Sequence, residues 1–217
     1  KRLKLMAFEA LKLLQDKCGV TADGAFGPNT AKAIVDYYKW SPERGAHMLG
    51  QLVHESNSFK ATTENLNYSA EALLAVHPRY FKTKEQAEEY ERQPQKIANY
   101  IYMDENRTKK GALGNIDQND GWMWRGRGFL QCTGRSNYRS FASDMRVPQV
   151  MDDPSLVATE YAMESAIWFF KRNNIWRICD EGVNEDTIKR VTKIINGGYN
   201  GLDHRIKETK KIYGWLK

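Results

Sequence analysis

Residues 41–58 contain a complete helix signal, and this stretch most constrains what the chain can fold into. Ser41 followed by Pro42 is a strong helix start, with a hydroxyl at the N-cap and proline at the first helical position. Four small or apolar residues then recur at helical spacing and predict one buried face. They are Ala46, Leu49, Gly50 and Val53. The polar cluster at 56–58 predicts the end of the helix.

Glu55 falls in the last turn of this predicted helix, and its position makes it a candidate general acid. The C-terminal end of a helix dipole is negative, which favours the protonated form of a carboxyl. Glu64 follows nine residues later in the polar segment 62–65, which predicts a better solvated and more easily ionised group. A glycoside hydrolase requires two carboxyls whose environments push their pKa values apart.

The composition leaves several partners open and excludes some classes of site. The 217 residues carry a formal charge of +6, which suits a polyanion such as nucleic acid, an anionic membrane or a bacterial cell wall. The basic residues are scattered and no recognition motif appears, so nucleic acid is a poor candidate. The three cysteines are widely spaced and the four histidines do not cluster. We therefore expect neither a disulfide framework nor a metal site, and no cofactor.

Membrane insertion and export signals are not evident in the sequence. No apolar run approaches the length of a membrane span, and no apolar signal core follows the basic start of the chain. These features predict folding in a reducing cytoplasm. The basic segment 207–217 is expected to form a terminal helix that packs Ile212 and Trp215 on the core, with a membrane-active role as the alternative. We expect a monomer.

The first forty residues predict two short helices around a turn. A helix is expected over 3–18, and Pro28 stands where a second helix would begin. The string Asp-Gly-Ala-Phe-Gly-Pro-Asn-Thr at 23–30 resembles the helical peptidoglycan-binding domain, although the second Asp-Gly repeat of that family is absent. The resemblance implies a wall-binding module at 1–40 with Asp23, Phe26 and Thr30 as binding residues. Simple core and turn roles for them are the alternative.

The rest of the chain predicts further helices and one loop-rich stretch. Helical patterns cover 83–103, with a break at Pro94, then 155–173 and 184–195. Within the loop-rich part, Trp122 and Trp124 could either pack or stack on sugar rings.

The segment 129–133 is expected to be extended. Alternation along it would aim Gln131 and Thr133 to one side as a polar pair, suited to holding a water or a sugar hydroxyl.

Four strings, in this order, resemble glycoside hydrolase family 19, which includes plant-type chitinases and bacteriophage endolysins. They lie at 54–56, 126–133, 165–170 and 195–198, and together they span roughly residues 41–200. The resemblance implies a mainly α, lysozyme-like catalytic domain at 41–217 behind the wall-binding module at 1–40. It implies no cofactor.

The resemblance also implies roles for single residues. Glu55 would be the general acid and Glu64 the general base of an inverting mechanism, with Glu71 as a competing base. Thr133 stands where the family usually has serine and would help to position the attacking water. The expected substrate-binding residues are His54, Trp124, Gln131, Asn137 and Asn196.

The leading hypothesis is a bacteriolytic phage endolysin, an N-acetylmuramidase that hydrolyses β-1,4 bonds of peptidoglycan. It would be made in the host cytoplasm and reach the wall after holin-type release. The order of a wall-binding module before a catalytic domain resembles endolysins of phages that infect Gram-negative hosts. The alternatives are a chitinase of the same family and a non-catalytic cell-wall-binding protein. Cleavage by an N-acetylglucosaminidase would use the same acid and base.

Overall fold

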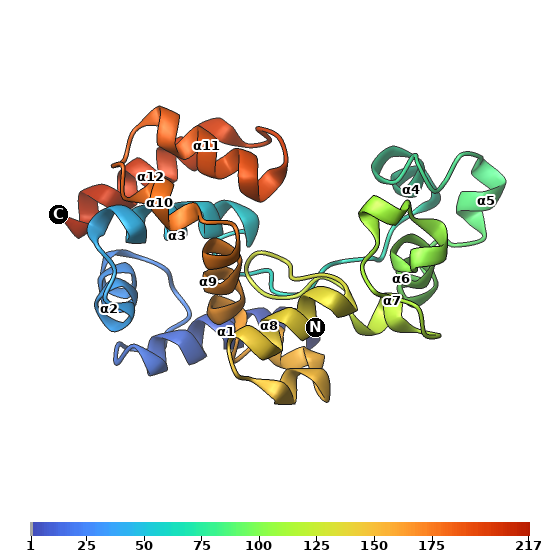
Figure 1. Cartoon of the computed structure of the whole chain (residues 1–217), viewed down its shortest axis with the longest axis horizontal. Coiled ribbons are helices and arrows are strands. Elements are labelled where there is room, and N and C mark those ends of the chain that lie inside the picture. The colour runs from blue at the N-terminus through green and yellow to red at the C-terminus, as the bar shows by residue number, and fades with distance from the viewer. Residues whose placement is uncertain (1) are drawn as a thin grey trace. The chain divides into compact units, whose positions relative to one another are not determined.

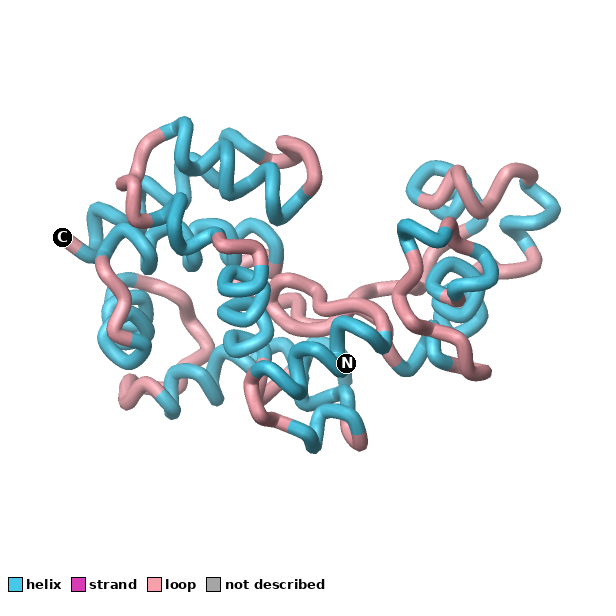
Figure 2. The backbone as a smooth tube through the Cα atoms, in the orientation of Figure 1, coloured by secondary structure: helices cyan, strands magenta, loops and turns pink. Residues whose placement is uncertain are grey.

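The computed structural model describes the backbone of residues 2–217 and the side chains from residue 9 onward. Over this part of the chain it consists of helices and loops, with no strand (Figures 1 and 2). The only extended pairing among the described residues is a set of isolated antiparallel bridges, Thr63 with Arg127 and Arg127 with Cys132. The expectation of a mainly α protein is confirmed. No described helix combines the length and apolar character needed to cross a bilayer.

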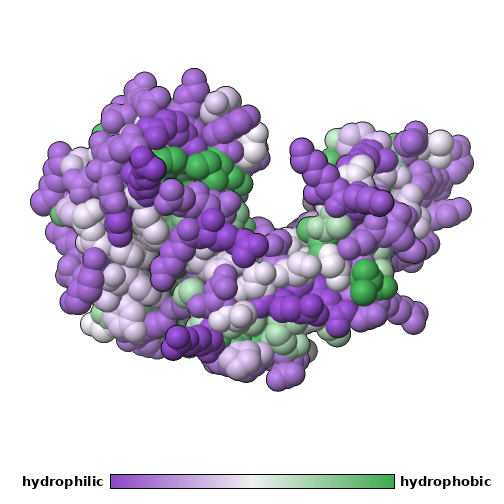
Figure 3. Space-filling view, viewed as in Figure 1, coloured by the Kyte–Doolittle hydropathy of each residue, from purple (hydrophilic) through white to green (hydrophobic). Residues whose placement is uncertain are grey.

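The chain forms two compact units. Unit 1 contains residues 1–62, 128–130 and 155–217, and unit 2 contains residues 63–127 and 131–154. The chain therefore leaves unit 1 and returns to it twice. In both units hydrophilic side chains cover most of the surface that faces the viewer (Figure 3).

Unit 1 is built from seven α-helices of the described chain. They are α1 (Arg2–Lys17), α2 (Pro28–Tyr38), α3 (Pro42–Glu55), α9 (Ala162–Arg172), α10 (Ile175–Cys179), α11 (Glu185–Asn196) and α12 (Leu202–Leu216). Helix α3 begins as predicted, because the Ser41 hydroxyl accepts a hydrogen bond from the Arg44 amide at 3.2 Å. Its Met48, Leu49 and Leu52 are fully buried. This helix is the centre of the unit.

Helices α3 and α12 make the most extensive helix contact among the described elements. Gly50 permits their close approach: a Cβ atom there would lie 2.2 Å from Thr209 Oγ1 and 2.7 Å from Thr209 Cα. Ile212 is fully buried one turn further along α12, which confirms the prediction that this helix packs on the core. Trp215 is partly buried against the same core.

We expect Gly50→Ala to lower the free energy of unfolding by about 1–3 kcal/mol, because the new methyl group would press on backbone as well as side-chain atoms of α12. Urea denaturation would measure the change. Gly214→Ala is the matched control, since Gly214 is also helical but a Cβ there meets nothing within 4 Å. That variant should be neutral or more stable, owing to alanine's higher helix propensity. Equal effects of both substitutions would contradict the close-packing argument.

The N-terminal segment packs into unit 1. Its apolar residues Leu11, Leu14 and Ile34 belong to the same core cluster as helices α3 and α9. Glu164 of α9 accepts a hydrogen bond from Tyr38 at 2.8 Å and forms an ion pair with Lys17. The structure therefore does not divide at residues 40/41, where the sequence predicted a domain boundary, because the first helices share their core with the C-terminal third of the chain.

Unit 2 contains shorter helices and more loop. Its α-helices are α4 (Ala70–Val76), α5 (Lys84–Glu88), α6 (Pro94–Tyr102), α7 (Asp120–Met123) and α8 (Arg135–Asp144). Short 3-10 turns lie at Asp104–Asn106, Lys109–Gly111 and Pro148–Met151. A separate small core of Leu73, Phe81, Ile97 and Ile101 holds α4, α5 and α6 together. The predicted break at Pro94 separates α5 from α6, as expected.

Two predicted elements differ in the structure. The region 155–173 is a 3-10 helix at Pro154–Ala158 followed by α9, which begins only at Ala162. The segment 129–133 is not extended: residues 128–131 form a tight turn, because Arg127 and Cys132 exchange backbone hydrogen bonds of 3.1 and 2.7 Å. Gln131 has a φ of +54° within that turn. The prediction of an extended segment, made from the alternation of side chains, is therefore wrong.

Candidate active site

Glu55 is the last residue of α3, and the chain turns sharply after it. Ser56 is fully buried, and its hydroxyl donates to the Leu52 carbonyl at 2.6 Å and accepts from the Phe59 amide at 2.8 Å. Asn57, Ser58 and Phe59 follow with φ angles of +49°, +56° and +65°. Three successive left-handed residues without glycine are unusual, and the buried Ser56 and Phe59 hold them in place. The helix end that carries Glu55 is thus rigidly defined.

The Glu55 carboxylate forms an ion pair with a buried arginine. Its Oε1 atom lies 2.5 Å from Arg205 Nη2, and the side chains of Glu55 and Arg205 are 23% and 1% exposed. The same guanidinium donates to Gln51 Oε1 at 2.6 Å and to the Asn200 carbonyl at 3.0 Å. Gln51 in turn donates to Thr192 at 3.0 Å. Helices α3, α11 and α12 therefore jointly fix the orientation of the Glu55 carboxylate.

His54 lies beside Glu55 and packs on the start of α12. Its Nδ1 atom is 3.0 Å from Nδ1 of His204, and its ring presses on Gly201, where a Cβ atom would come within 2.0 Å of the imidazole. Partial burial lowers the pKa of His54, and the positive charge of Arg205 adds to that effect. The imidazole is therefore neutral at physiological pH. Its predicted contact with substrate stays a prediction.

Glu64 belongs to unit 2, where it pairs with the loop before the turn at 128–131. Its amide donates to the Gly126 carbonyl at 2.9 Å, and its Oε2 accepts from the Gly126 amide at 3.3 Å. Its Oε1 accepts a short hydrogen bond from the Tyr102 hydroxyl. Burial raises the pKa of Glu64, while the Tyr102 and Gly126 hydrogen bonds and the charge of Arg125 oppose that rise. The expectation of a well-solvated, easily ionised Glu64 is therefore wrong.

Three polar side chains converge on Gly126. A Cβ atom at this glycine would lie 2.7 Å from Gln131 Oε1, 3.1 Å from Thr133 Oγ1 and 3.2 Å from Glu64 Oε2. The Thr133 hydroxyl also donates to the Gln131 carbonyl at 3.0 Å. Gln131 and Thr133 thus lie on one side, as predicted, although a turn rather than an extended segment places them there. Oxygen atoms of this kind around a carboxylate can hold a water or a sugar hydroxyl.

Asn137 lies one turn behind Thr133. The side-chain Nδ2 of Asn137 donates to the Thr133 carbonyl at 2.8 Å, so Asn137 positions the backbone of Thr133. A direct contact between Asn137 and sugar stays a prediction.

Trp124 is buried and takes no part in an open surface. Its side chain is only 3% exposed, its Nε1 donates to Asp120 Oδ1 at 3.0 Å, and its ring packs on Tyr138. The structure corrects the prediction that Trp124 binds substrate, because a ring with so little exposed surface cannot stack on a sugar. The sequence feature that indicates burial of Trp124 is Asp120, four residues earlier, because its carboxylate accepts a hydrogen bond from the indole.

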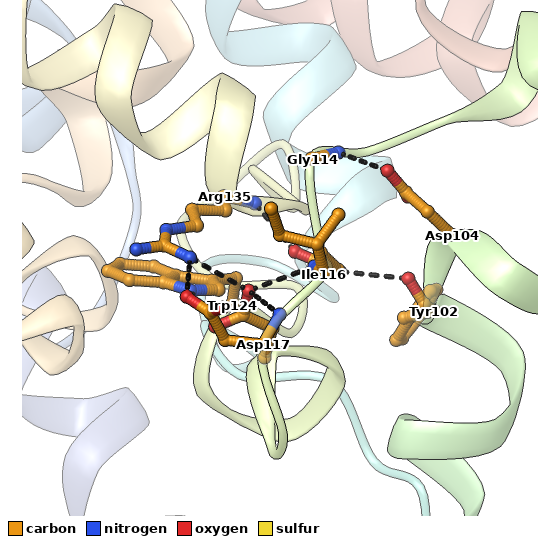
Figure 4. Close-up of polar contacts among 9 residues, drawn as sticks. Tyr102, Asp104, Gly114, Ile116, Asp117, Trp124 and Arg135 are labelled. Atoms are coloured by element: carbon orange, nitrogen blue, oxygen red, sulfur yellow. Dashed lines mark hydrogen bonds and ion pairs between the residues drawn. The ribbon is translucent and has the colours of Figure 1, made fainter.

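A polar network supports this part of unit 2 (Figure 4). Asp120 accepts hydrogen bonds from the amides of Ile116 and Asp117, both at 3.1 Å, and forms an ion pair with Arg135 at 3.2 Å. The fully buried Asn115 donates to the Tyr102 carbonyl at 2.9 Å and accepts from the Arg135 amide at 2.9 Å. The network therefore anchors Tyr102, the hydrogen-bond donor of Glu64, to the start of α8.

Asn196 ends α11 in unit 1. Its Oδ1 accepts from the Asn200 amide at 3.3 Å, and Gly197 adopts the left-handed conformation, with φ of +76°, that ends the helix. The predicted helix stop is confirmed. Asn196 is exposed, and its contact with sugar stays a prediction.

The three predicted wall-binding residues have intramolecular roles. The buried Gln15 donates to Asp23 Oδ1 at 2.9 Å and to Thr30 Oγ1 at 3.0 Å, which holds the turn at 23–27 against α1. Thr30 is only 4% exposed, so the prediction that it contacts the wall is wrong. Phe26 packs on Phe59, with ring centroids 4.6 Å apart. Wall contacts of Asp23 and Phe26 stay predictions.

Two residues beside the carboxyls were not identified from the sequence. Arg205 shares a helical stripe with Thr209 and Ile212, and an arginine within a buried stripe is the signal that could have singled it out. Tyr102 had no such signal, because a tyrosine at the end of a helix is common. In the described part of the chain, no group of three His, Cys, Asp or Glu side chains is arranged to hold a metal ion.

The chain matches no family model. It is 37% identical over 168 residues to a protein of Haemophilus influenzae described as a glycosyl hydrolase family 19 domain-containing protein. The match covers 75% of this chain and 74% of that protein. The mainly helical structure is consistent with the lysozyme-like fold expected for that family. The chain belongs to glycosyl hydrolase family 19, and this membership supports a glycoside hydrolase activity.

Proposed function

We propose that this family 19 protein is a bacteriolytic endolysin that hydrolyses β-1,4 glycosidic bonds of peptidoglycan as an N-acetylmuramidase. The observation that carries the proposal is the convergence of Glu64, Gln131 and Thr133 on Gly126. Burial raises the pKa of the Glu64 carboxyl, which makes its carboxylate a stronger base. Family membership supports glycan as the substrate class. The positive charge of the chain suits the anionic cell wall.

The proposed mechanism is a single displacement with inversion. Glu55 must first take up a proton, because its ionised form pairs with Arg205. It then donates that proton to the glycosidic oxygen as the bond to the anomeric carbon breaks. A water attacks that carbon from the opposite face, and Glu64 accepts its proton. Thr133 and Gln131 orient the water through their side-chain oxygens. The proton leaves Glu55 and a proton arrives on Glu64, so solvent must exchange both before the next turnover.

Glu64 is the better supported of the two candidate bases. It accepts hydrogen bonds from Tyr102 and Gly126, whereas Glu71 lies exposed in the first turn of α4. A base needs a fixed orientation toward the water that it deprotonates. Glu71→Gln therefore serves as a matched control for Glu64→Gln.

The proposal extends to the partner and place of action. Peptidoglycan would be the partner of a monomeric enzyme made in the host cytoplasm and released to the wall. Asp23 and Phe26 would contribute to wall binding by the first forty residues.

Mass spectrometry of borohydride-reduced fragments from purified peptidoglycan tests the proposed activity. Reduced N-acetylmuramic acid ends would support the muramidase assignment. Reduced N-acetylglucosamine ends would reassign the bond, and cleavage of chitin alone would replace the proposal by a chitinase. The absence of new reducing ends on either polymer would leave wall binding without catalysis.

Tyr102→Phe is expected to move the acidic limb of the pH–activity profile to higher pH. Glu64 must be ionised to accept a proton, and burial already raises its pKa. The Tyr102 hydroxyl stabilises the ionised carboxylate, so its removal raises that pKa further. Activity should then fall several-fold below wild type on the acidic side and approach wild type at higher pH. Initial rates between pH 4 and pH 8 would measure this; a limb that does not move would contradict Glu64 as the base.

A further inference from the structure

Arg125 lies beside the candidate base and has a constrained guanidinium. It is half-buried in unit 2, and its Cζ lies 3.6 Å from the centroid of the Trp122 ring. Its Nη1 donates to the Trp122 carbonyl at 2.8 Å. Stacking and this hydrogen bond together restrict a side chain that would otherwise sample many rotamers. The guanidinium is thus preorganised before any ligand arrives.

Arg125 remains a cation without an internal carboxylate partner. Among the described residues, no carboxylate oxygen lies within 4.0 Å of its nitrogens. Arg135, in the same unit, pairs with Asp117 and Asp120, which shows that the unit supplies counter-ions elsewhere. Burial lowers the pKa of Arg125 to about 10, and the neighbouring charge of Arg127 adds to that effect. The group is still charged at neutral pH, and a partly desolvated charge of this kind is stabilised by an anion.

The position of Arg125 ties that anion to the substrate. The next residue, Gly126, accepts a hydrogen bond from the Glu64 amide and donates one to the Glu64 carboxylate. Glu64 also interacts with Arg125 electrostatically without an ion pair. A glycan held at the Glu64 cluster would therefore bring its substituents near the guanidinium. Peptidoglycan carries carboxylates on the 3-O-lactyl group or on the stem peptide attached to it, whereas chitin carries none.

We propose that Arg125 is a specificity residue that binds a carboxylate of the peptidoglycan substrate. This inference rests on the proposed function and deepens it by naming the substrate group that distinguishes peptidoglycan from neutral glycans. The guanidinium has five N–H donors, of which one is used by the Trp122 carbonyl, so it can still hold a carboxylate through two parallel hydrogen bonds.

The test compares two enzymes on two forms of one polymer. Wild type and Arg125→Gln would be assayed on native peptidoglycan and on peptidoglycan whose carboxyls have been converted to methylamides, at one pH and ionic strength. We expect Arg125→Gln to lower kcat/KM on native polymer roughly 10-fold or more, mainly through KM. On the amidated polymer the two enzymes should agree within about two-fold, because a removed carboxylate leaves Arg125 nothing to bind.

Arg139→Gln is the matched control, since Arg139 is an exposed cation in the same unit. It should retain wild-type activity on both polymers. A third substrate, glycan stripped of its peptides by an amidase, separates the two sources of the carboxylate. If Arg125 still matters there, it can bind the lactyl carboxylate that the amidase exposes, and if it does not, the stem peptide supplies the carboxylate; both results support the proposal.

An equal loss on native and amidated polymer, with a shifted acidic limb of the pH profile, would overturn the proposal and show that Arg125 acts through Glu64. A loss no larger than that of Arg139→Gln would also overturn it. Both results leave the proposed function intact, provided that wild type cleaves peptidoglycan. If wild type cleaves chitin and not peptidoglycan, the proposed function itself fails.

Discussion

Glu55→Gln is expected to reduce kcat on peptidoglycan roughly 10³-fold while the protein remains folded. A general acid contributes about 10²–10⁴-fold to such reactions, and an amide cannot donate a proton to the glycosidic oxygen. Glutamine keeps the volume of Glu55, and its side-chain oxygen can stay in contact with Arg205. Reducing-end release from purified peptidoglycan would measure the activity, and the thermal unfolding midpoint would report on the fold.

The control for this substitution is Glu71→Gln, which makes the same chemical change at an exposed site. It should keep at least half of wild-type activity. A Glu55→Gln protein that lyses cells and releases new reducing ends at wild-type rates would remove Glu55 from the mechanism. Lysis that persists without new reducing ends would instead indicate disruption of the wall by binding.

Local signals were sufficient for most helices of this chain. Ser41 and Pro42 start α3, and Asn184 starts α11 through a capping box with Thr187, because caps and apolar periodicity depend on residues within a few positions of one another. The segment 129–133 failed for the opposite reason. Its conformation is set by the exchange of hydrogen bonds between Arg127 and Cys132, which overrides the alternation of its side chains.

The division of the chain could not be read from local patterns. A turn motif at 23–30 suggested a separate module, yet Leu14 and Ile34 share a core with helices more than a hundred residues later. Apolar stripes show that a helix has a buried face, but not which helix covers it. The resemblance to glycoside hydrolase family 19, which rests on several strings in order, is confirmed by the Haemophilus influenzae relative.

The environments of the candidate site residues were predicted less well than the helices. Gln131 and Thr133 do gather with Glu64, but Glu64 is partly buried in its loop and accepts a hydrogen bond from Tyr102 of α6, 38 residues along the chain. Trp124 was assigned to substrate because its aromatic character was visible and its internal partner Asp120 was not weighed. Partners of this kind, distant for Glu64 and local for Trp124, determine whether a polar or aromatic residue is available to a ligand.

Arg205 is the partner that matters most for Glu55, and its removal is expected to be strongly destabilising. Arg205→Met should lower the free energy of unfolding by about 3 kcal/mol, because it leaves the Glu55 carboxylate without its cation and Gln51 Oε1 without its donor. Urea denaturation with an unchanged m-value would measure the loss. The exposed ion pair of Arg190 with Glu181 provides the control, and Arg190→Met should cost below about 1 kcal/mol.

A double-mutant cycle identifies the cause of that loss. If the unpaired charge of Glu55 dominates, Arg205→Met should cost markedly less in a Glu55→Gln background than in wild type, because glutamine carries no charge to leave uncompensated. If the cost is the same in both backgrounds, the lost bonds to Gln51 and Asn200 explain it instead. In that case Arg205 stabilises the junction of α3 and α12 without specifically supporting the catalytic carboxyl. A reduced cost would show that the buried Arg205 stabilises the fold mainly by compensating the charge of Glu55. The stability of unit 1 would then depend on the ionisation of the residue proposed to start the reaction.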